Sequence, residues 1–193
     1  MENTGTRSPA SARDWPWMNA SLPPDERASL LLAQMTLEEK VDMLTEKSGA
    51  GLPPSRLGIP ALTFADGPAG IRIDRSRRDV NEGKATSSPA PIALAATWDL
   101  AAAQQYGDLL GLEAWSTGHN VLFGPGLDIV RIPIFGRLFE SLGEDPVLTG
   151  QMAARYIQGV QGHPVISTAK HYNVNVQEEN RLEVNVQIDE RTL

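Results

Sequence analysis

The chain has 193 residues, 41% of them hydrophobic, a formal net charge of −7 and no cysteine. This length suits a domain with a sizeable core, and the lack of cysteine excludes disulfides, thiolate metal sites and a cysteine nucleophile. The densest basic run, residues 72–78, is interrupted by Asp74, so no basic stripe for nucleic acid is present. We expect a cytoplasmic protein without a membrane partner, because neither a signal-peptide core nor about 20 consecutive apolar residues are found.

Two helices are predicted near the N-terminus, after a flexible leader of residues 1–20. Prolines at 23–24 followed by acidic residues mark the start of the first helix, and apolar residues then recur every three or four positions. The second helix begins with a capping box, in which Thr36 and Glu39 each bind the backbone amide of the other. We expect this helix to end near Gly49.

Short apolar strands and helices alternate in the rest of the chain. Strands are predicted at 61–65, 91–95, 120–123 and 165–169, and helices at 100–115 and 145–161. This alternation is typical of a parallel sheet covered by helices, an α/β fold. Four strands followed by an acid-rich helix start at 189–193 amount to about half of a (β/α)8 barrel of roughly 250 residues. We therefore expect residues 21–193 to form the first half of a TIM barrel, as a fragment of a longer domain.

Polar residues follow three of the predicted strands. Asp66 comes after the first, Asp128 and then Arg137 after the third, and Lys170 with His171 after the last. Because the carboxyl ends of parallel strands meet at one mouth of a barrel, four of these side chains can line a single pocket: Asp66, Arg137, Lys170 and His171. A carboxylate, a guanidinium, an ammonium and an imidazole together suit a polyhydroxylated ligand such as a sugar.

Each of these motifs also has a purely structural interpretation. Asp-Gly-Pro is commonly a turn capped by its aspartate, and adjacent Lys and His can be an ordinary polar strand edge. Arg137 can hold Glu140 or Glu144 in an ion pair around a helix start. The order of the motifs, each at a strand end, favours the common pocket.

The same segments resemble glycoside hydrolase family 3. The similarity runs from Leu22 to Leu193 and rests on Met-Thr-Leu-Glu-Glu-Lys (35–40), Leu-Gly-Ile-Pro (57–60), Asp-Gly-Pro-Ala-Gly-Ile-Arg (66–72), Gly-Arg-Leu-Phe-Glu (136–140), Glu-Asp-Pro (144–146), and Ala-Lys-His-Tyr (169–172) through Asn175, Glu178 and Arg181. This resemblance implies a retaining β-glycosidase that releases a terminal β-linked sugar without a cofactor or metal. Residues 172–178 lack the second histidine of the N-acetylhexosaminidase branch, which favours the β-glucosidase branch.

The resemblance also implies substrate-binding roles. Asp66 would accept hydrogen bonds from sugar hydroxyls, and Arg137, Lys170 and His171 would donate to them. In the same way, Arg72 and Arg181 would lie in this subsite or just behind it, where they orient the carboxylates.

The catalytic residues implied by the family are not found in this chain. The nucleophile of the family is an aspartate in a Ser-Asp-Trp-like motif, and no segment matches it. The acid/base of this branch usually comes from a following domain. We therefore expect the nucleophile and the acid/base beyond Leu193.

Two functions from different classes are consistent with the sequence. The first is a β-glucoside hydrolase for which this chain supplies the sugar subsite. The second is a catalytically inactive half-barrel that acts as a binding or assembly module and self-associates through unpaired sheet edges. The first is favoured, because no lysine-rich edge or final helix compensates for an open sheet. A dinucleotide-binding protein is disfavoured, since no Gly-x-Gly-x-x-Gly follows a strand.

Overall fold

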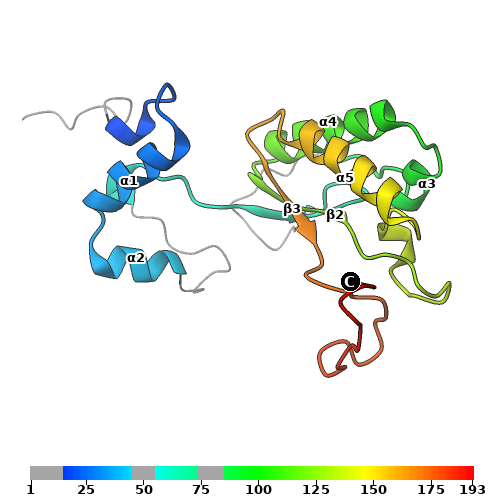
Figure 1. Ribbon diagram of the computed structural model, residues 1–193. Helices are drawn as coiled ribbons and strands as arrows, with labels where there is room; N and C mark the ends of the chain where they lie inside the picture. Colours follow the sequence, from blue (N-terminus) through cyan, green and yellow to red (C-terminus); the bar gives the residue numbers. More distant parts are fainter. Residues whose placement is uncertain (1–14, 45–54, 74–84) are drawn as a thin grey trace, which may run out of the picture. The chain divides into compact units, whose positions relative to one another are not determined.

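The computed structural model describes residues 15–44, 55–73 and 85–193 (Figure 1). The chain divides into two compact units, residues 1–62 and 63–193. Most of the predicted leader, the predicted end of the second helix near Gly49 and most of the basic run lie outside the described residues.

The first unit is built from short helices. In chain order these are the 3-10 helix η2 (Pro16–Met18), α1 (Pro24–Gln34), α2 (Leu37–Leu44) and the 3-10 helix η3 (Ser55–Leu57). Trp17 is buried against Met35 and Leu57, and its indole Nε1 donates to the Leu57 carbonyl at 3.2 Å. The segment from Trp15 onward, predicted as part of a flexible leader, is therefore folded, because a large aromatic side chain anchors it.

The predicted capping box is confirmed at the start of α2. The Thr36 amide donates to Glu39 Oε2 at 2.8 Å, and the Glu39 amide donates to Thr36 Oγ1 at 3.2 Å. Arg56 binds the same Glu39 carboxylate at 2.6 Å, so this carboxylate links α2 to η3.

The second unit contains a parallel three-stranded sheet with helices packed on it (Figure 1). Its strands are β1 (Phe64–Asp66), β2 (Val121–Gly126) and β3 (Ile166–Lys170), in the order β1-β2-β3, and its helices are α3 (Pro91–Ala95), α4 (Leu100–Ser116) and α5 (Pro146–Val160), with the 3-10 helix η4 (Leu138–Glu140). The predicted α/β class, with a parallel sheet as in part of a (β/α)8 barrel, is confirmed.

The predicted strand at residues 91–95 is wrong, since this segment is the helix α3. Pro91 occupies the first helical turn, where its missing amide costs nothing and its fixed φ suits a helix. The amides of Ala93 and Leu94 both donate to the Ala90 carbonyl, which closes that turn. The described residues therefore hold three strands where the sequence predicted four.

The helices α4 and α5 pack with their main chains in contact, and Figure 1 shows them side by side. A Cβ atom on Gly107 would lie 2.1 Å from the Tyr156 carbonyl oxygen, and one on Gly159 would lie 2.2 Å from the Gln104 carbonyl oxygen. Only glycine permits this approach. Met152, Tyr156 and Val160 are buried on the α5 face that the sequence predicts as apolar.

Burial differs between the strands. β2 is almost entirely buried, as expected for a strand covered on both faces, whereas β3 is largely exposed and Ile166 is 53% exposed. β3 pairs with β2 on one side, so its other edge is open within the described part of the chain. Self-association through such an edge stays a prediction.

None of the helices described in this chain combines the length and the apolar character that crossing a membrane requires.

The buried α4 face gives a test of the core. Leu110 is completely buried, whereas Leu112 on the same helix is 50% exposed. We expect Leu110→Ala to lower the free energy of unfolding by about 2–5 kcal/mol, because it removes buried methyl groups and leaves a cavity. Leu112→Ala is the matched control and should cost less than about 1 kcal/mol. Urea titrations followed by circular dichroism measure both, and equal losses would contradict the packing described here.

Candidate functional site

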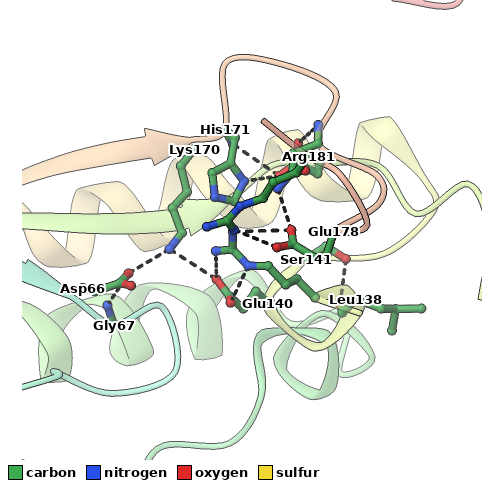
Figure 2. A network of polar contacts seen from close by, with 12 residues as sticks. Asp66, Gly67, Leu138, Glu140, Ser141, Lys170, His171, Glu178 and Arg181 are labelled. Carbon is green, nitrogen blue, oxygen red and sulfur yellow. Dashed lines mark hydrogen bonds and ion pairs between the residues drawn. The ribbon is translucent and has the colours of Figure 1, made fainter. Parts of the chain in front are cut away.

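The ends of β1 and β3 are joined by an ion pair. Lys170, the last residue of β3, places its Nζ atom 2.8 Å from Oδ1 of Asp66, the last residue of β1 (Figure 2). The same Nζ lies 3.2 Å from Glu140 Oε2. Because the strands are parallel, residues 104 positions apart meet where the carboxyl ends of the strands lie together.

The guanidinium of Arg137 and the carboxylate of Glu140 form a two-point contact. Arg137 Nε donates to Oε1 at 3.0 Å and Nη2 donates to Oε2 at 2.9 Å. This geometry, in which a planar fork meets a carboxylate, is the strong form of an ion pair. The structural ion pair considered from the sequence is therefore present with Glu140, and the contact of Glu140 with Lys170 connects it to the strand ends.

A second carboxylate, Glu178, extends the cluster into the segment after β3. Its Oε2 accepts from Arg181 Nη1 at 2.7 Å, its Oε1 accepts from Asn175 Nδ2 at 3.0 Å, and Arg137 Nη1 lies 3.7 Å away. The ion-paired cluster thus contains three acidic and three basic side chains: Asp66, Glu140, Glu178, Arg137, Lys170 and Arg181.

His171 is held by a carboxylate that follows β2. Its Nδ1 lies 2.6 Å from Asp128 Oδ2, and its backbone amide donates to the same oxygen at 3.3 Å. Asp128 Oδ1 accepts the Asn175 amide at 2.8 Å. Asp128 is therefore connected to the end of β3 and to the segment beyond it.

The turn after β1 fixes the position of Asp66. Gly67 and Gly70 have φ values of 147° and 124°, a region that favours glycine, and the Gly67 amide donates to Asp66 Oδ1 at 3.0 Å. The hydroxyl of Tyr106 on α4 donates to the Pro68 carbonyl at 3.0 Å, which ties this turn to the helix layer. Burial raises the pKa of Tyr106 to about 12, so this hydroxyl keeps its hydrogen at neutral pH.

The structure does not bring the Arg72 side chain into this cluster. The Arg72 backbone amide donates to the Asp66 carbonyl at 2.8 Å in an antiparallel bridge, and the residue is exposed. The other five residues predicted to bind substrate line one cavity of about 640 Å³: Asp66, Arg137, Lys170, His171 and Arg181. Apolar side chains from Phe123 and residues 174–186 complete its wall.

Ion pairing controls the protonation of the two glutamates. Partial burial would raise the pKa of Glu140, but the hydrogen bond from Arg137 and the charge of Lys170 outweigh it and hold the pKa below its ordinary value. For Glu178 the same opposition between desolvation and the contacts of Asn175, Arg137 and Arg181 lowers the pKa. The hydrogen bond to Glu140 in turn raises the pKa of Arg137. All three groups are charged at neutral pH.

Asp128, Glu140 and Glu178 were not among the substrate-binding residues predicted from the sequence. Asp128 could have been found by the signal used for Asp66 and Lys170, a polar residue at the end of a strand, since it follows the Gly-Pro-Gly end of β2. Glu140 and Glu178 each stand three positions from an arginine that they bind. This spacing is a usable signal only inside a helical turn, which the sequence does not predict for these segments.

A family model described as the glycosyl hydrolase family 3 N terminal domain matches residues 26–193. The chain belongs to glycosyl hydrolase family 3. The predicted family, which the sequence motifs suggested, is therefore confirmed.

Relatives that match this chain include proteins named as β-glucosidases. Thermostable beta-glucosidase B of Acetivibrio thermocellus is 39% identical over 171 residues, which are 84% of this chain and 22% of that protein. Beta-glucosidase B of Emericella nidulans is 44% identical over 165 residues, 84% of this chain and 19% of that protein. The chain therefore spans about a fifth of the length of these relatives.

Solved structures of β-glucosidases share the fold. DesR from Streptomyces venezuelae, in complex with D-glucose, matches with a TM-score of 0.73 and 39% identity, over 85% of this chain and 21% of that one. Beta-glucosidase 3B from Thermotoga neapolitana, in complex with glucose, matches with a TM-score of 0.69 and 38% identity, over 78% of this chain and 23% of that one.

The lowered pKa of Glu140 predicts how acid affects the fold. Since this pKa lies below the ordinary 4.5, ionised Glu140 stabilises the fold above pH 4.5, and the contribution is lost as the pH falls through the folded-state pKa. We expect Glu140→Gln to be less stable than the wild type at neutral pH and to lose less stability on acidification. Thermal unfolding between about pH 7 and pH 3 measures this, and identical pH profiles would contradict it.

Proposed function

We propose that this chain supplies the sugar-binding subsite of a retaining β-glucosidase-type hydrolase that acts on a terminal β-linked sugar. The observation that carries the proposal is the gathering of Asp66, Lys170, His171 and Arg137 around one cavity at the carboxyl ends of the strands. Two related β-glucosidase structures contain bound glucose, which supports a sugar as the ligand.

The contacts of the cluster support a direction for two of the proposed hydrogen bonds with the sugar. Asp66 uses Oδ1 for Lys170 and Gly67, and we assign Oδ2 to a ligand hydroxyl that donates to it. Lys170 has three hydrogens and no lone pair, so beside its two carboxylates it can donate to one hydroxyl oxygen. Such charge-assisted bonds contribute to rate where they tighten as the sugar ring flattens toward an oxocarbenium ion.

The carboxylates of this chain serve binding in our proposal, and the reacting pair lies elsewhere. Retaining hydrolysis needs a nucleophile and a general acid about 5 Å apart, and the acid needs a raised pKa. Glu140 and Glu178 are bound to arginines and have lowered pKa values, which makes them poor proton donors at neutral pH. We place the nucleophile and the acid/base beyond Leu193, and the greater length of the relatives supports this.

Binding of glucose tests the subsite. We expect Asp66→Asn to weaken glucose binding about tenfold, because a charged acceptor is lost and tenfold corresponds to roughly 1.4 kcal/mol. Asp108→Asn is the matched control, since Asp108 binds His163 outside the cavity and should leave the affinity unchanged. Isothermal titration calorimetry measures all three proteins. Equal affinities for the wild type and Asp66→Asn would contradict a role of Asp66 in the subsite.

A hydrolysis assay tests whether the catalytic pair lies outside this chain. We expect the purified 193-residue chain to release no nitrophenol from an aryl β-glucoside above the rate in buffer. The Lys170→Met variant, purified in parallel, detects contaminating host enzyme, which would give the same rate in both preparations. Release by the wild type that Lys170→Met abolishes would overturn the assignment of the catalytic pair to residues outside this chain.

A further inference from the structure

Asp128 is the least exposed carboxylate that contacts the predicted site residues. Its side chain is 5% exposed, compared with 16% for Glu140, 28% for Glu178 and 47% for Asp66. Three groups lie within hydrogen-bond distance of its oxygens: the ring Nδ1 of His171 at 2.6 Å, and the amides of His171 at 3.3 Å and Asn175 at 2.8 Å, which donate to it. A buried carboxylate with this set of donors is held in one orientation and fixes the orientation of the imidazole.

We infer that Asp128 is a positioning residue: in the neutral form of the His171 ring it holds the hydrogen on Nδ1, so that Nε2 meets the ligand as a hydrogen-bond acceptor. An ionised carboxylate only accepts hydrogen bonds, so the ring nitrogen 2.6 Å from it carries the hydrogen. A neutral imidazole has one hydrogen, and Nε2 is left with a lone pair. The inference rests on the proposed sugar subsite, because it concerns how His171 meets a ligand there.

The tautomer changes what the adjacent residues Lys170 and His171 recognise. Lys170 can only donate, whereas His171 in this state accepts from a hydroxyl that donates to Nε2. The sequence led us to expect donation from His171, whereas a neutral ring whose Nδ1 donates to Asp128 accepts at Nε2. One sugar hydroxyl then accepts a hydrogen bond from Lys170, and another donates one to His171. A ligand with an ether oxygen or fluorine facing His171 has no hydrogen to donate there.

The experiment observes the ring nitrogens directly. The full chain is labelled with ¹⁵N-histidine, and long-range ¹H–¹⁵N spectra are recorded at alkaline pH, so that the tautomer of the neutral rings is observed. The chain has three histidines, and His171→Gln assigns the signals of interest. We expect the Nδ1–H tautomer for His171 in the wild type. In Asp128→Asn we expect a shift toward Nε2–H and about tenfold weaker glucose binding.

The matched control is Asp108→Asn, which removes an aspartate that binds a different histidine, His163. Asp108 Oδ1 lies 2.9 Å from His163 Nε2 on the α4–α5 surface, so this variant should move the His163 signals and leave both His171 and glucose affinity unchanged. An aspartate with a merely structural role would lower stability on substitution without changing the tautomer, which would overturn the inference.

The wild-type spectrum decides the question even where Asp128→Asn fails to fold. A hydrogen on Nε2 of His171 in the wild type overturns the inference without any variant. A folded Asp128→Asn protein in which His171 keeps the wild-type tautomer and glucose binds with unchanged affinity overturns it as well. Loss of the proposed function is recognised separately, since a wild type that binds no glucose refutes the sugar subsite while the spectrum of the free chain still reports on Asp128.

Discussion

The ammonium of Lys170 between the carboxylates of Asp66 and Glu140 is the contact on which the rest of the site depends. It joins the last residue of β1, the last residue of β3 and the 3-10 helix η4, three segments that the chain delivers from distant positions. The Lys170 side chain is 12% exposed, so its charge is screened less by water than that of a surface lysine. Without such a cation, the carboxylates of Asp66 and Glu140 would repel each other at the carboxyl ends of the strands.

The remaining polar side chains extend this contact into a balanced network. Arg137 and Arg181 neutralise Glu140 and Glu178, so the acidic and basic side chains of the cluster balance each other. A neutral ligand rich in hydroxyls suits such a surface, since it can exchange hydrogen bonds without bringing a charge of its own. The network also keeps the groups in place before a ligand arrives, which lowers the entropic cost of binding.

The sequence predicted the features that depend on chain order, and it missed those that depend on local conformation. The parallel strands, the α4 and α5 helices and the meeting of Asp66 with Lys170 follow from apolar runs and from polar residues at strand ends. The prediction for residues 91–95 is wrong because a short apolar run is compatible with either a strand or a helix. Pro91 at its start is compatible with both as well, so the sequence alone does not choose between them. Arg72 does not line the cavity, and its backbone pairs with Asp66 in an antiparallel bridge, so a role just behind the subsite stays a prediction.

The contact of main chains between α4 and α5 has a consequence for the spacing of the site. These helices immediately precede β2 and β3, and the latter two strands carry Asp128 and Lys170 with His171 at or just after their ends. A spacing set by peptide groups cannot be tuned by swapping one side chain for another of similar size, as ordinary helix contacts can. Gly107 and Gly159 therefore set the distance between α4 and α5 and, through the strands that follow these helices, the spacing of the site residues. A larger residue at either position would displace site groups that neither glycine contacts.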